Sequence, residues 1–269
     1  MATTWRLIVS GAAAGDWNMA ADELLLEEAA HGGRPTLRLY RWSEPTLSLG
    51  YFQSPDDLPR NQTWHAVVRR PTGGGAILHD REVTYAVAAR ESLADSPGLY
   101  AAMNRVIMRA VAALGVGEAV AACAVGPADR GTGSPSPKGA GFTAAQRGPF
   151  FCFERAGATD IIARSRKLAG GAQRKRSGAI LQHGSILLET NQPGAIGLAE
   201  LAGRTVAFDE LAAAFVAAFR EEFHATLTPE AFGKEELARI EAIRLRRYAN
   251  ASWLHHGERR RQHNEQGNS

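Results

Sequence analysis

Cysteine is scarce in this sequence, and its scarcity excludes several classes of protein. The 269 residues contain two cysteines, Cys123 and Cys152, which are too few for the disulfide framework of a small secreted domain. No Cys-x-x-Cys or His-Glu-x-x-His spacing occurs, so the common zinc-binding patterns are absent. We therefore expect a protein of the reducing cytoplasm that uses neither a metal ion nor another cofactor.

Long apolar runs are missing as well. The chain has no stretch of about 18 apolar residues, the length that a membrane-spanning helix needs. The apolar patch in WRLIVSG near the N-terminus is too short for a secretory signal. We expect no membrane association, and we interpret this patch as a first strand.

An excess of charge of one sign is also absent, since 31 basic and 28 acidic residues leave a formal net charge of +3. Nucleic-acid binding usually requires clustered Lys and Arg with interleaved aromatic residues. The one dense basic run, Arg259–Arg261, lies instead in a polar C-terminal segment. We expect no nucleic-acid partner, whereas an acidic protein partner agrees with this charge.

Apolar residues are plentiful, because 45% of the residues are hydrophobic and 22% are charged, the balance of a folded domain with a large core. After the first strand, a helical pattern covers residues 16–33, with Asp16 or Asn18 as the expected N-cap. Several short β-prone runs follow between residues 35 and 89. Apolar residues at helical spacing predict a second helix over residues 96–115.

The second half of the chain opens with a segment of different composition. Residues 126–149 are rich in Gly, Pro and Ser and predict a long loop. Strand signals resume over residues 158–189, and two further helices are predicted beyond them. Runs of strands flanked by helices favour an α+β fold with a mixed β-sheet. We expect residues 1–255 to form a single domain and residues 256–269 to form a polar, flexible tail.

Three consecutive glycines, Gly73, Gly74 and Gly75, follow a pair of arginines in the stretch RRPTGGGAILHD. Because glycine lacks a Cβ and tolerates positive φ, such a run lets main-chain N–H groups approach a ligand closely. Arg69 and Arg70 would add positive charge beside it. Two interpretations remain open: a ligand cradle, or a bulged hairpin turn between the strands predicted on either side.

Cys152 follows the predicted loop, within PFFCFE. A cysteine among phenylalanines is either a small buried hydrophobic residue or a nucleophile, and a nucleophilic thiolate needs positive charge nearby. The basic segment ARSRKLAGGAQRKR follows it. There Lys167 precedes a predicted tight apolar bend, and we expect burial and the charges of Arg164 and Arg166 to lower its pKa, which suits proton transfer. A solvated hairpin is the alternative.

Two histidines, His79 and His183, lie in apolar strand-like segments. Each is either a base or a hydrogen-bonded structural residue. A nucleophilic serine of the Gly-x-Ser-x-Gly type is absent from the sequence.

Taken together, these segments resemble the lipoate-protein ligase and octanoyltransferase superfamily, whose catalytic domain is related to biotin-protein ligases. The resemblance extends from NMAADELLL to YANASW, and its most specific parts are VVRRPTGGGAILHD, FFCFE and RKLAGGAQRKRSGAILQHGSILL. The chain is most similar to the cysteine-dependent octanoyltransferases of Gram-positive type. The resemblance implies the fold of a biotin/lipoate-protein ligase catalytic domain.

The resemblance also implies an activity: transfer of an octanoyl group from acyl carrier protein to a lysine of a lipoyl domain, such as the glycine cleavage H protein. Cys152 would carry the acyl group as a thioester, and Lys167 would act as a base or stabilise the oxyanion. The implied substrate-binding residues are Arg69, Arg70, Gly73, Gly74, Gly75, His79, Gly170, Gly171, Gln173, His183, Gly184 and Ser185.

Three alternatives stay open at this point. The chain can be the catalytic subunit of an ATP-dependent lipoate-protein ligase, or an amidotransferase that moves octanoyl groups between lipoyl domains through the same cysteine. A non-enzymatic module that binds lipoyl domains is the third. The presence of both Cys152 and Lys167 favours an enzyme over a binding module.

Overall fold

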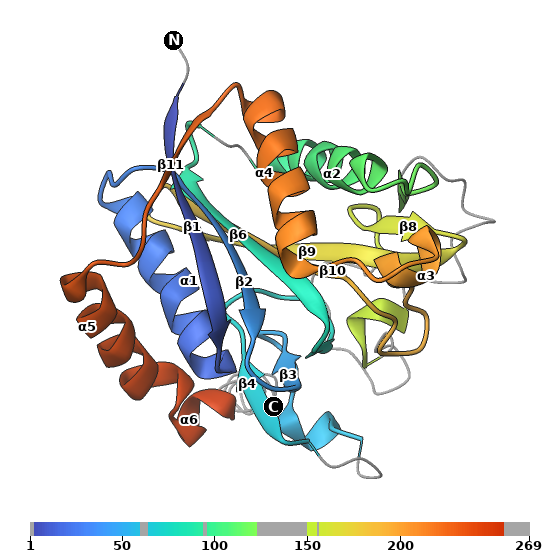
Figure 1. Ribbon diagram of the computed structural model, residues 1–269. Helices are drawn as coiled ribbons and strands as arrows, with labels where there is room; N and C mark the ends of the chain where they lie inside the picture. Colours follow the sequence, from blue (N-terminus) through green and yellow to red (C-terminus); the bar gives the residue numbers. More distant parts are fainter. Residues whose placement is uncertain (1–2, 60–63, 94–95, 123–149, 155, 256–269) are drawn as a thin grey trace.

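The computed structural model describes residues 3–59, 64–93, 96–122, 150–154 and 156–255. Its large sheet is mixed, and its strands follow the order β11-β1-β2-β6-β10-β9-β8-β7. The bounds in that order are β11 (Thr226–Pro229), β1 (Thr4–Ala13), β2 (Thr36–Trp42), β6 (Glu82–Arg90), β10 (Ala179–Leu187), β9 (Arg166–Arg176), β8 (Ile161–Ala163) and β7 (Val120–Ala121). Figure 1 shows this sheet running through the molecule. β1 pairs in parallel with β2 and β11, and the other pairs are antiparallel.

A second, smaller sheet contains β3 (Thr46–Leu49), β4 (Ala66–Arg69) and β5 (Ile77–His79). Its order is β4-β3-β5, with β3 parallel to β4 and antiparallel to β5. The strands on either side of the three glycines are therefore separated by β3. The hairpin interpretation of this glycine segment is wrong, because the segment crosses the end of β3 instead of joining paired neighbours.

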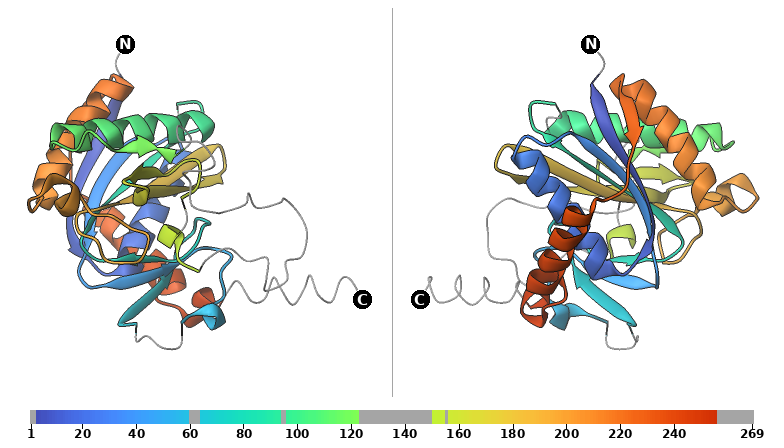
Figure 2. Two further views of the ribbon diagram at one scale, coloured as in Figure 1. Left: turned by 90° about the vertical axis from the view of Figure 1, so that its right-hand side faces the viewer. Right: turned by 60° about the vertical axis from the view of Figure 1, so that its left-hand side comes forward.

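Helices cover both faces of the large sheet. Their bounds are α1 (Gly15–Ala30), α2 (Ser96–Ala113), α3 (Leu198–Ala202), α4 (Phe208–Phe223), α5 (Lys234–Ile243) and α6 (Ala251–Leu254), with a π-helical turn at Arg244–Tyr248. One apolar core joins the sheet to α2 and α4, and a second joins it to α1 and α5. Figure 2 shows the two helix pairs on opposite sides of the sheet.

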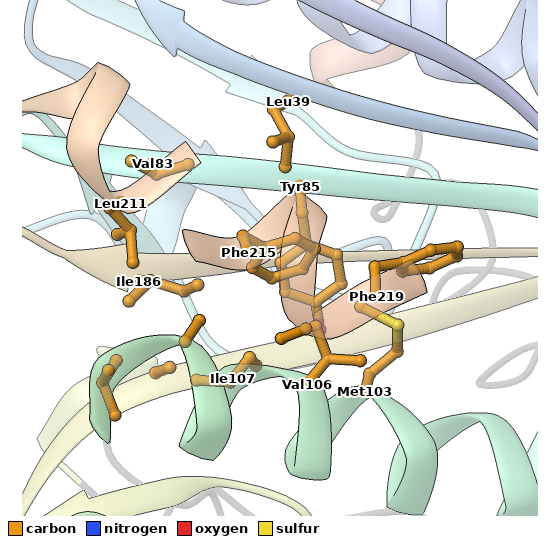
Figure 3. Close-up of a cluster of buried hydrophobic side chains, with 14 of the residues drawn as sticks. Leu39, Val83, Tyr85, Met103, Val106, Ile107, Ile186, Leu211, Phe215 and Phe219 are labelled. Carbon is orange, nitrogen blue, oxygen red and sulfur yellow. The ribbon is translucent and has the colours of Figure 1, made fainter. Parts of the chain in front are cut away.

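The larger core explains why β6 is so apolar. Eight of the nine residues of β6 are buried, as expected for a central strand that is covered on both faces. On the face towards α2 and α4, Val83 and Tyr85 belong to one buried cluster with Ile107 and Phe215 (Figure 3), and the Tyr85 and Phe215 ring centroids are 5.5 Å apart. The predicted α+β fold with a mixed sheet flanked by helices is confirmed.

The N-cap prediction for α1 is wrong. Ala14 occupies the cap position without a side-chain hydrogen bond. The Asn18 amide instead donates to the carbonyl oxygens of Ala13 and Arg41, at 3.1 and 3.2 Å, and Asp16 forms an ion pair with Arg244 at 2.7 Å. Asp16 Oδ1 also accepts a hydrogen bond from the Trp17 N–H at 2.7 Å. Asp16 therefore stabilises the first turn from within the helix, and neither predicted side chain occupies the cap position.

Two tight hairpins set the register of β8, β9 and β10. Arg164 and Ser165 join β8 to β9, with φ values of 48° and 59°. Ser177 and Gly178 join β9 to β10, with φ values of 51° and 73°. Two successive positive φ angles are typical of the two-residue turns that match the twist of antiparallel strands. Lys167 is consequently opposite Ile162, and Gly170 is opposite Ser185.

The loop predicted over residues 126–149, the tail 256–269 and Cys123 lie outside the described residues. The single domain expected over residues 1–255 stays a prediction. Within the described ranges, no helix combines the length and the apolar character that crossing a bilayer requires.

Candidate active site

Cys152 and Lys167 are in direct contact. The Lys167 ammonium lies 3.2 Å from Cys152 Sγ and 3.3 Å from the Cys152 carbonyl oxygen. Cys152 begins a short 3-10 turn, Cys152–Glu154, and its N–H donates to the Ala76 carbonyl at 2.7 Å. This bond attaches the cysteine to the residue that follows the three glycines. The structure therefore unites the two residues that the resemblance named as catalytic.

Asp160 is the second partner of Lys167. Its Oδ2 lies 2.8 Å from Lys167 Nζ, and both side chains are buried. The same oxygen accepts a hydrogen bond from the Gly157 N–H at 2.6 Å. Burial alone would lower the pKa of Lys167, but the Cys152 sulfur and the Asp160 carboxylate together raise it above the ordinary value of 10.5.

The expected lowering of the Lys167 pKa is therefore wrong, for two physical reasons. Burial does oppose the charge, as anticipated, but the Cys152 sulfur and the Asp160 carboxylate, both within hydrogen-bond distance, outweigh it. The arginines do not add to the potential as expected, since Arg164 pairs with Glu118 and Arg166 pairs with Glu200 at the surface. The predicted tight bend is also absent, because Arg166–Arg176 is one continuous strand.

A cavity extends from Cys152 across the large sheet. The space between its walls is about 460 Å³ when the part open to solvent is included, and about 50 Å³ of it admits the centre of a water-sized molecule. Its apolar and aromatic lining comes from Met19, Tyr40, Trp42, Ile77 and Ala172. The other lining residues are Arg70, Gly73, Gly74, His79, Thr84, Cys152, Gly170, Gly171, His183, Gly184 and Ser185. Most of the predicted substrate-binding residues thus surround one space.

The glycine segment forms part of the cavity wall and also supports the cysteine. Gly73 and Gly74 line the cavity, and Gly74 has a φ of 97°, which favours glycine. Gly75 instead touches the cysteine, since a Cβ there would lie 3.0 Å from the Cys152 nitrogen. The three glycines therefore allow the chain to pass this close to Cys152.

Arg70 holds the same glycine segment in place through hydrogen bonds to its carbonyl oxygens. Its guanidinium donates to the carbonyl oxygens of Gly73 and Gly75, at 2.8 and 2.7 Å, and to Ser48. Burial lowers the pKa of Arg70 to about 10, and the nearby Cys152 sulfur opposes that shift. Arg70 is thus a second cation beside the sulfur atom.

Three predicted substrate-binding residues, Arg69, Gly75 and Gln173, lie outside the cavity lining. Arg69 is fully buried, and its guanidinium donates to carbonyl oxygens of the chain, those of Gly50, Tyr51, Gln53, Trp253 and Leu254. It thereby attaches α6 to the loop after β3. The Gln173 amide donates to Gln182 Oε1 at 2.7 Å, on the opposite face of the sheet.

Both histidines line the cavity, but each ring is hydrogen-bonded at both nitrogens. His79 contacts Glu82 Oε1 and Ser48 Oγ, each at 2.7 Å. His183 contacts Asp22 Oδ2 at 2.9 Å and Thr72 Oγ1 at 2.7 Å. Each ring is thus held in place from both sides by side chains of the protein. These contacts support the structural interpretation of the two histidines.

Three buried carboxylates were not recognised in the sequence: Asp160, Asp22 and Glu82. Asp160 lies within the predicted strand segment and directly precedes β8, and a register for the β8–β9 hairpin would have placed it near Lys167. Asp22 lies in α1, where it bonds Arg38, Tyr40 and His183, and no local pattern in the sequence connects these residues. Pairing of this kind depends on tertiary structure.

The sequence was also compared with known protein families and their members. Residues 15–202 match the family described as the lipoyl protein ligase A/B catalytic domain. The chain belongs to this family. Octanoyltransferase LipM of Symbiobacterium thermophilum is 36% identical over 290 residues, covering 94% of this chain and 98% of that protein. LipM of Kyrpidia tusciae is 33% identical over 282 residues, covering 93% and 98%. These relatives confirm the prediction of an octanoyltransferase, an acyl-transferring enzyme.

Solved structures support the fold. A bi-partite lipoate protein ligase from Thermoplasma acidophilum, studied with its E2 lipoyl domain, superposes with a TM-score of 0.70 at 19% identity, covering 94% of this chain and 96% of that one. Lipoate-protein ligase A bound with ATP gives a TM-score of 0.69 at 21% identity, covering 94% and 98%. The predicted likeness to lipoate-protein ligase catalytic domains is confirmed.

Proposed function

We propose that this octanoyltransferase carries the acyl group on Cys152 as a thioester, between an acyl carrier protein donor and a lysine of a lipoyl domain. The observation that carries the proposal is the 3.2 Å contact between Cys152 Sγ and Lys167 Nζ at one end of an otherwise largely apolar cavity. A sulfur atom, an adjacent cation and a space for a hydrocarbon chain are what a covalent acyl relay needs.

In the first step, the Cys152 thiolate attacks the carbonyl carbon of the donor thioester. A new carbon–sulfur bond forms, and the carrier leaves as a thiolate that takes up the proton released from Cys152. The Lys167 ammonium stabilises the attacking thiolate and the oxyanion of the tetrahedral intermediate. Because one thioester replaces another, this step is close to isoenergetic.

In the second step, the amine of the acceptor lysine attacks the same carbonyl carbon. The Cys152 thiolate leaves, an amide bond forms, and the amine loses a proton. Acylation removes the negative charge of the sulfur, one of the two groups that raise the pKa of Lys167. Burial then has more weight, so the pKa of Lys167 falls. The Lys167 ammonium can give its proton to the leaving Cys152 sulfur, and the neutral amine that results can take the proton that the acceptor amine loses.

The acceptor assignment is supported by the family and by the name of its relatives. The Thermoplasma ligase was studied with an E2 lipoyl domain, and the glycine cleavage H protein is a comparable acceptor. For the donor, the thiolate chemistry favours an acyl thioester, such as octanoyl acyl carrier protein. An ATP-activated acid would need no cysteine nucleophile, and this difference separates the proposal from a ligase.

The test is intact-mass spectrometry after incubation with octanoyl acyl carrier protein in the absence of ATP. We expect the wild-type protein to gain one octanoyl group and Cys152→Ser to gain none. Cys123→Ser is the matched control and should keep the adduct, since it removes the other cysteine. Lys167→Met is expected to slow acylation by about a hundredfold or more.

Transfer is followed by adding a lipoyl domain to the isolated acyl-enzyme. Loss of the adduct together with gain of octanoyl mass on the domain supports the relay. Acceptor modification that requires ATP and free octanoate, and survives in Cys152→Ser, would instead show a ligase. Binding of the domain without modification by any donor would show a non-catalytic module.

A further inference from the structure

The floor of the cavity is a single row of residues that crosses four strands. Tyr40 of β2 pairs with Thr84 of β6, Thr84 pairs with Ser185 of β10, and Ser185 pairs with Gly170 of β9. All four residues line the cavity. Because paired residues point to the same face of a sheet, the cavity runs across the strands, from β9 to β2.

The two ends of this row differ in chemistry. At the β9 end, a Cβ on Gly170 would lie 2.8 Å from Lys167 Nζ, so the reacting sulfur and amine are located there. Cys152 packs there against the buried cluster that contains Ile77 and Phe153. At the β2 end, Met19, Tyr40 and Trp42 belong to a different buried apolar cluster.

The distance between the ends can be compared with an acyl chain. An extended chain advances about 1.2 Å per bond, so an octanoyl group spans about 8–9 Å. Neighbouring strands are about 4.8 Å apart, and the chain therefore covers roughly two steps of the row. A chain that starts beside Gly170 ends over Thr84, where Tyr40, Trp42 and Met19 close the space.

The residues at this end differ in how firmly they are held. The Trp42 indole N–H donates to Thr84 Oγ1 at 2.8 Å, and its ring stacks on His79 with centroids 3.9 Å apart. The Tyr40 hydroxyl donates to Asp22 at 2.8 Å. Met19 is buried and unbranched, and it has no polar group to anchor it. Changing Met19 therefore alters the length of the cavity without breaking a hydrogen bond.

We propose that Met19 determines the acyl-chain length that this enzyme accepts, by closing the end of the cavity farthest from Cys152. This inference rests on the proposed function, because it assumes that the acyl chain is attached at Cys152. Replacing Met19 by Ala lengthens the cavity, and replacing it by Phe shortens it. The preferred chain should change accordingly, in opposite directions.

The experiment offers the full-length protein an equimolar mixture of hexanoyl, octanoyl, decanoyl and dodecanoyl acyl carrier proteins, and the adducts are read by intact mass. We expect the decanoyl-to-octanoyl ratio to rise about tenfold or more in Met19→Ala, the effect of one or two methylenes in a fitted pocket. In Met19→Phe the hexanoyl-to-octanoyl ratio should rise. Met103→Ala, a buried methionine in the core on the other face, should keep the wild-type profile.

An unchanged octanoyl preference in both Met19 variants, with circular dichroism showing that each is folded, would overturn the inference. A second measurement is independent of Cys152 chemistry: thermal stabilisation by free octanoic, decanoic and dodecanoic acids. If the wild-type protein forms no adduct, the proposed relay fails. A shift of the best-stabilising acid to a longer chain in Met19→Ala would then still support the length assignment, and no shift would refute it.

Discussion

At the scale of single residues, the site is an arrangement of charges around one sulfur atom. Lys167 is buried and has the Asp160 carboxylate on one side and Cys152 on the other. A buried ammonium is stable only when such partners compensate for lost hydration. Lys167 therefore remains a cation at neutral pH in the free enzyme, and it can stabilise negative charge and donate a proton before it accepts one.

Removing the Asp160 charge tests this arrangement. We expect Asp160→Asn to lower the free energy of unfolding by about 3–5 kcal/mol, because it leaves the Lys167 charge buried without its carboxylate partner. Glu200→Gln, which breaks an exposed ion pair with Arg166, should cost about 1 kcal/mol or less. Urea unfolding of the three proteins measures both differences. Equal effects of the two substitutions would contradict a buried, charged Lys167.

The loss of unfolding free energy in Asp160→Asn should depend on pH. The folded-state pKa of Lys167 is raised above 10.5, so the stabilising pair is complete below the unfolded pKa and is lost as the pH rises through the folded pKa. From neutral pH upward, the difference in unfolding free energy between wild type and Asp160→Asn should be constant to about pH 10 and decrease above it. A difference that grows with pH would contradict this sign.

Ser185 offers a second test at this scale. It is fully buried and lines the cavity, and its hydroxyl finds no hydrogen-bond partner within the described ranges. Burying such a hydroxyl costs about 1–3 kcal/mol, so Ser185→Ala should keep or raise the free energy of unfolding. Acylation of Cys152 should slow by about tenfold or more if this hydroxyl donates to the acyl carbonyl. Denaturant unfolding and single-turnover acylation measure the two effects.

At the scale of elements, β9 and β10 bring the site together because they carry glycines where side chains would collide. A Cβ on Gly184 would lie 2.5 Å from the Gly170 carbonyl oxygen and 2.6 Å from the Tyr85 ring. A Cβ on Gly170 would lie 2.5 Å from Lys167 Cε. The first contact supports strand pairing, whereas the second sets the position of the Lys167 amine.

Alanine substitutions should separate these two roles. We expect Gly184→Ala to lower the melting temperature by about 5 °C or more, since neither backbone nor ring can move away. Gly170→Ala should cost less stability, because the Lys167 side chain is flexible, but should reduce acylation strongly. Gly11→Ala, with no atom within 4 Å of its Cβ, is the control. Thermal denaturation and the mass assay give the two readouts.

At the scale of the whole molecule, the net charge of +3 is too small to attract an acidic partner by itself. Attraction must therefore come from charged residues near the cavity. Arg174 is exposed and lies over the Tyr51 ring, with its guanidinium carbon 5.1 Å from the centroid. The neighbouring Phe52 is 68% exposed, and its ring lies 4.0 Å from a Cβ built on Gly73, which lines the cavity. A cation and an exposed aromatic ring thus lie beside the cavity, where a carrier would dock.

Partner binding should therefore weaken as salt rises, since exposed charges are screened beyond about 10 Å at 0.1 M salt. We expect Arg174→Ala to reduce affinity for an acidic carrier or lipoyl domain a few-fold at low salt and to reduce the salt dependence. Arg220→Ala, an exposed arginine of α4 on the other face of the sheet, should change neither. Calorimetry at several salt concentrations measures these affinities. An affinity that does not change with salt would contradict this expectation.

The sequence by itself determined most of the element order and the chemistry of the site. Periodicities of 2 and 3.6 residues are local properties, so they identified β1, β6, α2 and α4 without tertiary information. The glycine segment, Cys152 and Lys167 were also recognisable, because their chemical character belongs to the residues themselves.

Only the tertiary structure decided which of these groups meet. The register of β8, β9 and β10 places Lys167 beside Asp160 and aligns the row under the cavity, and the insertion of β3 between β4 and β5 changed the meaning of the glycine segment. The sign of the Lys167 pKa shift depended on the same contacts. Such pairings join residues that are distant in sequence, and their free energies depend on burial and distance, which no local pattern contains.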